Sequence, residues 1–180
     1  MKMIRRVMLA CLLAWATFVA FGANLSAAQI AILRPIVLAE PTLATARLTG
    51  DDGAIAAWLN AAASPAFTVW KTNVTITDTG KTFVGTEWAG MTNANHTRMQ
   101  TVAQWLSTGY NPSLPDIRAM FDDIWSGAGG VATRAKYLAF WKRLASRAEK
   151  ALATGTGSDA VPATLTFEGL VTGDDCSAMR

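Results

Sequence analysis

The chain has 180 residues, of which 51% are hydrophobic, and this length suffices for one ordinary domain with a buried core. Its formal net charge of +3 comes entirely from Lys2, Arg5 and Arg6, because thirteen basic and thirteen acidic residues balance from Asn24 onward. A neutral body argues against a protein that grips nucleic acid through phosphate contacts, so we expect no specific nucleic acid as a partner.

Residues 1–23 form an apolar leader. A basic start is followed by an apolar run over 7–21, the layout of a secretory signal, and Ser26-Ala27-Ala28 offers small residues for cleavage. The run is short for a transmembrane helix. Two interpretations stay open: the leader is a signal or membrane anchor, or it is a stray segment added by a start codon assigned too far upstream. Membrane contact is expected only through this leader.

Residues 24–180 are predicted to form a single, mainly α-helical domain with a few short β-strands. A capping-box sequence at 26–29 opens the first helix, which Pro35 bends and Pro41 ends. Asp residues after Gly50 are placed to cap a further helix. The helices expected before the break at Ser64-Pro65 are this first one, a short one over 42–48, and the one that follows Asp51-Asp52.

Residues 67–90 leave two structures open. Apolar residues on both sides of Asp78-Thr79-Gly80-Lys81 favour a small β-hairpin near 74–84. A helical turn is the alternative. The pattern is more clearly helical over 92–106, with apolar residues on one face, and Gly109 closes this helix.

The clearest helix begins at Leu114-Pro115 and stops near Gly127, with Ser113 placed to cap its first turn. Apolar side chains recur along one face at helical spacing, so we expect this face to be core. Asp122 and Asp123 fall on the other side and are expected to face solvent. The apolar face comprises Ile117, Met120, Phe121, Ile124 and Trp125.

A second helix is expected from 131–133 to about Ala145, and the capping-box sequence at 146–149 restarts a short helix. Residues 164–168 alternate polar and apolar side chains, which predicts a half-buried strand. A lone strand leaves backbone donors and acceptors open, so we expect it to pair with the 67–84 region or with another subunit.

Two strings carry a resemblance to a known family, NPSLPDIRAMFDDIWSG at 111–127 and SRAEKALATGTGSDAVPATLTFEG at 146–169. The chain resembles an uncharacterised family of small proteins encoded among the structural genes of tailed phages and prophages. Members share the Asn/Asp-Pro-Ser…Pro-x-x-Arg helix start and the Pro-Ala-Thr-Leu…Phe-Glu-Gly ending. The resemblance is specific over 111–170 and looser over 24–110. It implies a genomic context and no catalytic residues, and members begin close to the position of Asn24.

Three groups of residues are candidates for chemical sites. Thr79-Gly80-Lys81-Thr82 has the ending of a phosphate-binding loop, but Thr75 stands where that motif needs glycine. The acidic pairs at 51–52 and 174–175 follow glycine at predicted helix starts, where capping explains aspartate better than metal binding does. No sequence cue ties His96, the single histidine, to a nucleophile. We therefore expect no enzyme and no catalytic, metal or cofactor-binding residues.

A basic stripe is expected along the second helix and its extension. We interpret it as a solvated face, with contact to an acidic partner surface as the functional alternative. Most tryptophans are expected in the core, and surplus exposed ones would mark an assembly interface. The stripe comprises Lys136, Arg143, Arg147 and Lys150.

Together these features predict a phage- or prophage-derived structural or assembly protein that acts by contacts with other phage structural proteins or with itself. The genomic context of the family suggests the head–tail junction or tail assembly, and hence the virion or the host cytoplasm. The alternative is an exported or membrane-anchored bacterial protein of unknown role, held in the periplasm or inner membrane through residues 1–23.

Overall fold

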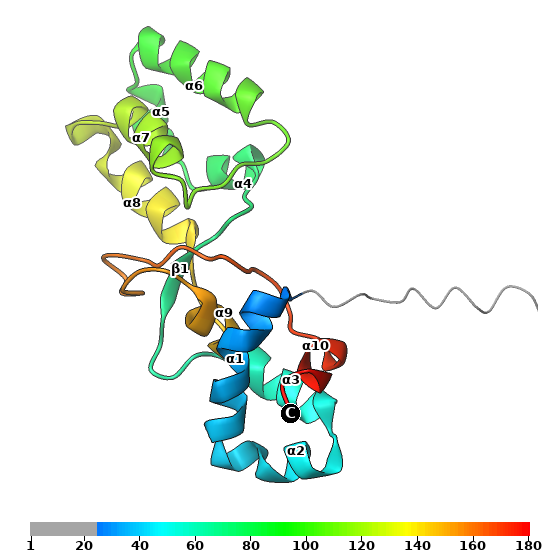
Figure 1. Ribbon diagram of the computed structural model, residues 1–180. Helices are drawn as coiled ribbons and strands as arrows, with labels where there is room; N and C mark the ends of the chain where they lie inside the picture. The colour runs from blue at the N-terminus through cyan, green and yellow to red at the C-terminus, as the bar shows by residue number, and fades with distance from the viewer. Residues whose placement is uncertain (1–24) are drawn as a thin grey trace, which may run out of the picture.

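The computed structural model describes residues 25–180, which form two lobes joined by a narrow ribbon (Figure 1). The terminal lobe combines residues 25–67 with 145–180, and the central lobe is the continuous segment 71–141. Each lobe has its own cluster of buried hydrophobic side chains. Over these residues ten α-helices accompany two short strands, which confirms the predicted class of a mainly α fold with a few short strands. The predicted leader, 1–23, lies outside the described residues.

The terminal lobe contains α1 (Ala27–Ala39), η1 (Pro41–Leu43), α2 (Ala44–Thr49), α3 (Asp52–Asn60), α9 (Arg147–Leu152) and α10 (Gly173–Ser177). α1 begins at the predicted capping box, in which Ser26 and Gln29 satisfy each other's backbone amides, and it contains Pro35. Both ends of the described chain share one core. Asn60 and Val171, 111 positions apart, exchange two hydrogen bonds of 2.8 and 2.9 Å, so α3 is fixed against the C-terminal segment.

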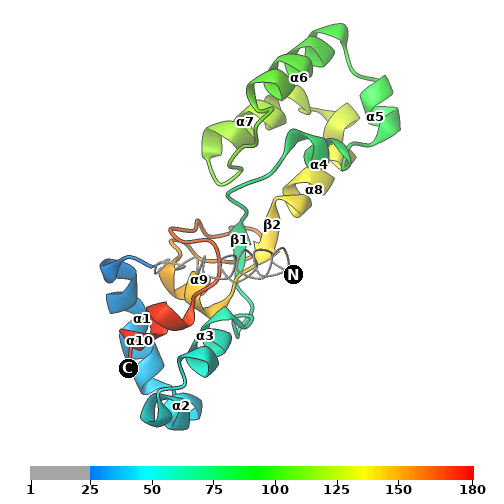
Figure 2. The ribbon, with the colours of Figure 1, turned by 90° about the vertical axis from the view of Figure 1, so that its right-hand side faces the viewer.

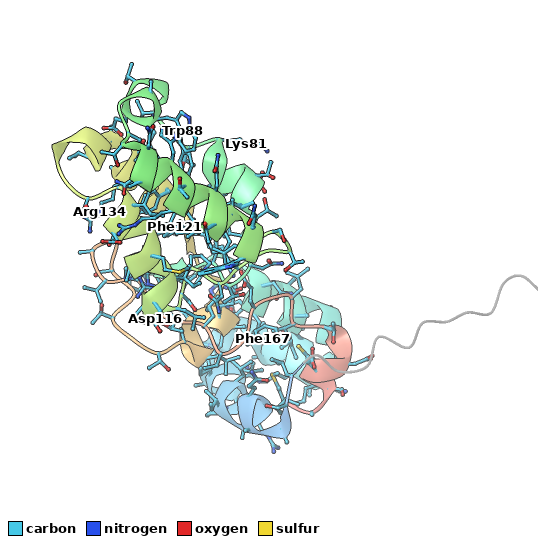
Figure 3. All side chains as sticks on the ribbon, turned by 90° about the horizontal axis from the view of Figure 1, so that it is seen from above. Lys81, Trp88, Asp116, Phe121, Arg134 and Phe167 are labelled. Carbon is cyan, nitrogen blue, oxygen red and sulfur yellow. The ribbon has the colours of Figure 1, made fainter. Side chains whose placement is uncertain are left out.

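The central lobe contains α4 (Ile76–Gly80), α5 (Gly85–Ala89), α6 (Asn93–Trp105), α7 (Pro115–Ile124), η2 (Ala128–Gly130) and α8 (Val131–Phe140). Its core is aromatic, and Figure 3 shows Phe121 inside it. Phe121 and Trp125 are 0% and 2% exposed, which confirms their predicted burial. The Trp141 ring lies 5.0 Å from the Phe121 ring and 4.6 Å from the Tyr137 ring, centroid to centroid.

Two antiparallel strands connect the lobes, and Figure 2 shows them side by side. β1 (Thr68–Trp70) pairs with β2 (Lys142–Leu144) in a register that sets Val69 opposite Arg143. The edge of β1 that faces away from β2 is hydrogen-bonded to Ala163. The Ala163 amide donates to the Thr68 carbonyl, and its carbonyl accepts from the Trp70 amide. The central lobe is therefore inserted between two paired strands that continue directly from the terminal lobe.

The predicted strand at 164–168 is wrong, although it touches the expected region. Ala163, the residue just before the predicted strand, forms a bridge with Val69 in the expected partner region, whereas Thr164 forms one with Thr154 outside it. Beyond this point the Thr166 hydroxyl donates to the Leu152 carbonyl at 2.7 Å. Because side chains bond to backbone groups there, the alternation of polar and apolar residues over 164–168 reflects alternating burial and not a ladder of backbone hydrogen bonds to a neighbouring strand.

The predicted hairpin near 74–84 is also wrong, and the helical alternative is confirmed. Thr75 caps α4 by accepting a hydrogen bond from the Asp78 amide at 3.1 Å. The Val84 amide, just before α5, donates to the Thr133 hydroxyl at 2.9 Å. Local capping and this distant hydrogen bond together favour two short helices over the two strands that the alternating sequence pattern predicts.

Two predicted details around α7 need correction. Ser113 does not cap the helix, because Leu114 occupies the cap position and the Ser113 carbonyl accepts from the Arg118 guanidinium at 2.7 Å. Asp122 does not simply face solvent, since it accepts hydrogen bonds from Arg134 and Tyr137. Asp123 is exposed as expected.

No single helix among residues 25–180 is long and apolar enough to cross a membrane. The helical segments over 27–39 and 41–49 meet at an angle of 89°. Together, but not singly, they are long and apolar enough to cross a membrane.

Replacement of residues 72–140 by Asn-Gly, together with Trp70→Thr and Trp141→Thr, is expected to leave the terminal lobe folded. The Lys71 amide donates to the Trp141 carbonyl at 2.8 Å, so the ribbon already holds the two cut ends at hairpin distance. Asn-Gly is the favoured two-residue turn. Circular dichroism should show helical signal and a cooperative thermal transition.

A matched control is the same variant without residues 171–180, which should lose the transition because α10 completes the core of this lobe. If the longer variant also lacks a cooperative transition, the terminal lobe depends on the central lobe for its folding.

Candidate functional site

The structure does not bring the four predicted basic residues together. Lys136 is exposed on α8 in the central lobe, whereas Arg143 lies on β2. Only Arg147 and Lys150 are neighbours, one turn apart on α9. The predicted helix to Ala145 is wrong, because α8 ends at Phe140 and the chain enters the ribbon, so the stripe is not one helical face.

Arg143 is occupied by carboxylates within the chain. Its guanidinium donates to both Glu149 oxygens at 2.7 and 2.6 Å, and to Glu168 at 2.8 Å. Glu168 also accepts from the Thr72 amide at 3.1 Å, so this cluster links the terminal lobe to the first residues of the central lobe. Burial by itself raises the pKa of Glu149, but hydrogen bonds from Arg143 and Ser146 outweigh it and hold the pKa below its ordinary value. Arg143 is therefore a structural residue.

A groove of about 670 Å³ lies between α1, η1, α3 and α9, and we call it the basic groove. Its apolar surface comes from Ile36 on α1, Trp58 on α3 and Ala151 on α9. Arg147 and Lys150 line the same groove. The two predicted residues that do meet therefore meet on an apolar, concave surface.

Both cations of the basic groove are held by aromatic rings. The Arg147 guanidinium lies 4.4 Å from the centroid of the Trp58 ring, and its Nη1 donates to the Trp58 carbonyl at 3.1 Å. The Lys150 ammonium lies 5.7 Å from the Phe67 ring and 3.4 Å from the Pro65 carbonyl. Within residues 25–180 neither cation forms an ion pair, so both charges are available to a ligand.

One carboxylate also lines the basic groove. Glu40 accepts hydrogen bonds from the hydroxyl and the amide of Thr42, at 2.7 and 3.1 Å. These bonds, with a smaller contribution from the charge of Arg147, lower the pKa of Glu40. The groove therefore carries two positive charges and one negative charge at neutral pH.

The central lobe has a second groove, of about 350 Å³, between α6 and α7, which we call the tryptophan groove. Trp105 lines it with 71% of its surface exposed, beside Val102, Met120 and Ile124. Arg98 and Asp123 form an ion pair of 2.9 Å there. Of the six tryptophans within residues 25–180, three are buried as predicted, two are half-buried, and Trp105 is the surplus exposed ring. The sequence carries one signal for it, since Trp105 lies at the edge of the apolar face that includes Val102.

The other sequence candidates have structural roles. Thr79 is buried and hydrogen-bonded to the Tyr110 hydroxyl, and Lys81 pairs with Asp78 at 2.6 Å. His96 packs edge-on against the Trp88 ring at 4.7 Å. Figure 3 shows Lys81 on the outer side of the central lobe. Asp51 caps α3 and Asp175 completes the capping box of α10, which confirms the capping interpretation of both acidic pairs.

Metal-ligating groups are not gathered in the part of the chain that the structure describes: no three His, Cys, Asp or Glu side chains form a possible ion site. Cys176 is buried in the terminal lobe, and burial raises the pKa of its thiol to about 12, so it is protonated at neutral pH. Comparisons with protein-family models, with curated proteins and with solved structures found no match. The geometry of the two grooves therefore carries the functional argument.

Proposed function

We propose that the chain is a structural or assembly protein of phage or prophage origin that acts by protein–protein contacts, at the head–tail junction or in tail assembly. The observation that carries the proposal is the exposed Trp105 ring in the tryptophan groove. A ring with 71% of its surface in water adds little to the stability of the isolated chain. On binding, the same ring gains burial, and tryptophan is enriched among residues that dominate protein interfaces.

The placement of the grooves supports a protein that joins two partners. The basic groove belongs to the terminal lobe and the tryptophan groove to the central lobe. Each lobe has its own core, so the two grooves lie on separately packed parts of the chain. Such a two-ended molecule suits a connecting role in an assembly.

The resemblance over 111–170 supports the identity of the partners. This segment contains α7, one wall of the tryptophan groove, and α9, one wall of the basic groove. The most family-like part of the chain thus contributes to both the basic groove and the tryptophan groove. Other phage structural proteins are the partners that this context favours.

Co-expression of the full chain with the products of its neighbouring genes tests the proposal. We expect a virion structural protein to co-purify, and Trp105→Ala to reduce its recovery about tenfold or more, as loss of a central interface tryptophan does. The helical signal and the thermal midpoint should not change, since Trp105 is exposed.

Leu144→Ala is the matched control, because Leu144 is 61% exposed and lies outside both grooves. It should leave recovery unchanged. Absence of any complex with a structural-gene product would contradict the proposal.

An exported or membrane-anchored protein is the second candidate. Ile32 and Leu38 on the outer side of α1 are 49% and 46% exposed, and only residues 24–26 separate α1 from the leader. Recovery of the full-length product from the periplasm, cleaved near Ala28, would favour this candidate. A cytoplasmic product that begins near Asn24 would favour the assembly protein.

A further inference from the structure

We propose that the basic groove binds an acidic peptide segment of a partner protein, with a carboxylate between Arg147 and Lys150 and an apolar side chain against Trp58. The proposal rests on the proposed function, because it specifies the chemistry of one of its protein contacts. It adds a ligand class and a binding site to the general statement that the chain acts by contact.

Charge complementarity identifies the carboxylate. Arg147 and Lys150 stand one helical turn apart on α9 and line one groove, and neither forms a salt bridge within residues 25–180. Only Nη1 of Arg147 makes a hydrogen bond within that part of the chain, so Nε and Nη2 remain as donors. A guanidinium with free donors on one side suits the two oxygens of a carboxylate.

The cations are positioned before a ligand arrives. Stacking on Trp58 and the hydrogen bond to its carbonyl fix the Arg147 guanidinium. Contacts with the Phe67 ring and the Pro65 carbonyl restrict the positions that the Lys150 ammonium adopts. Binding to side chains that are already ordered costs less conformational entropy. The cation–ring pairs also keep apolar surface next to the charges.

The apolar surface and Glu40 favour a peptide over a nucleic acid. Ile36 is 38% exposed at the groove, so an apolar side chain gains burial against it and Trp58. The Glu40 carboxylate repels a second negative charge, which disfavours a chain of phosphodiesters, whereas it accepts hydrogen bonds from peptide amides. The best ligand therefore has one acidic residue next to an apolar one, not a run of acids.

A library of short random peptides, displayed on phage particles and selected for binding to the immobilised full-length chain, tests the proposal. We expect enrichment of sequences in which Asp or Glu neighbours a large apolar residue. The strongest peptide, labelled with fluorescein, should bind about tenfold or more weakly to Arg147→Glu/Lys150→Glu in fluorescence anisotropy, and more weakly as salt is added. Lys136→Glu, on the other lobe, is the matched control and should leave the Kd unchanged.

A charge-swapped peptide makes the test specific. Replacing its acid by lysine should abolish binding to the natural chain and restore binding to Arg147→Glu/Lys150→Glu. If that double variant shows an altered helical signal, Arg147→Gln/Lys150→Gln replaces it and should still weaken binding. Selection of no peptide, or of peptides without acids, would overturn the proposal, as would binding that charge reversal leaves unchanged or that a single-stranded oligonucleotide abolishes.

This result is separable from the proposed function. Suppose that Trp105→Ala reduces the recovery of a structural-gene product, whereas charge reversal at Arg147 and Lys150 leaves that recovery unchanged. The basic-groove proposal then fails and the assembly proposal stands. If acidic peptides bind as expected and no structural-gene product does, the phage assembly role fails and the basic groove stands.

Discussion

Replacement of Trp141 by alanine is expected to lower the free energy of unfolding by about 3–5 kcal/mol, the usual cost of deleting a large buried aromatic side chain. Trp141 has no exposed surface and packs between Phe121 and Tyr137. Its Nε1 donates to the hydroxyls of Thr79 and Tyr110, at 3.2 and 3.1 Å, so truncation also removes a shared buried donor. Chemical denaturation measures the change. A loss below about 1 kcal/mol would show that this cluster is not core.

Phenylalanine substitutions separate packing from hydrogen bonding. Trp125 is similarly buried, but its Nε1 has no hydrogen-bond partner among residues 25–180. Trp141→Phe should therefore cost about 1 kcal/mol more than Trp125→Phe, the typical net contribution of a hydrogen bond. Equal costs would mean that the Trp141 donor contributes nothing.

Arg143→Ala is expected to lower the free energy of unfolding by about 3 kcal/mol, near the lower end of the range for breaking a buried ion pair. The Glu149 side chain is 5% exposed, so it would keep a buried charge without its partner, while the 28% exposure of Arg143 moderates the effect. Adding Glu149→Gln should recover part of the loss, because a neutral amide needs no countercharge and still accepts the Ser146 amide. No recovery would show that packing of the arginine side chain dominates.

Acid should destabilise the chain partly through Glu149. Its pKa is held below the ordinary carboxyl value, so its stabilising contribution is present above the unfolded-state pKa of about 4.3 and is lost as the pH falls through the lower folded-state pKa. Thermal midpoints measured from about pH 7 to about pH 3 should therefore fall more for the natural chain than for Glu149→Gln. Superimposable profiles would contradict this role.

The sequence predicts the local features of the fold well. Caps at Ser26 and Ser146 depend on residues three positions away, and both form as expected. The apolar face of α7 follows from helical spacing alone, and Phe121 and Trp125 are buried. These elements succeed because every partner that decides them lies within one or two turns.

The errors arise where distant partners decide the structure. The 74–84 region forms helices because Val84 bonds to Thr133, 49 positions away, and Thr79 to Tyr110, 31 positions away. The prediction of one continuous basic stripe is wrong because the helix ends at Phe140 and the chain then enters a ribbon of three-residue strands. Strands that short leave almost no sequence pattern.

The basic groove was only half visible in the sequence. Charge alone predicts Arg147 and Lys150 as possible partner contacts, and that role stays a prediction. Trp58, which holds Arg147, lies 89 positions earlier in the chain. No periodicity joins positions that far apart, so the apolar half of the site needs the folded structure.

The insertion of one lobe into the other has a consequence for the nascent chain. Residues 71–141 emerge during synthesis as one continuous segment that carries nearly all of the central core, whereas α1, α2 and α3 lack their partners until α9 and α10 follow. The Leu25 amide meets its acceptor on Asp175 only after 150 further residues have been made. Throughout elongation the earliest helices therefore expose their unpaired apolar surface. They stay open to chaperones for longer than the central lobe does, although they are synthesised before it.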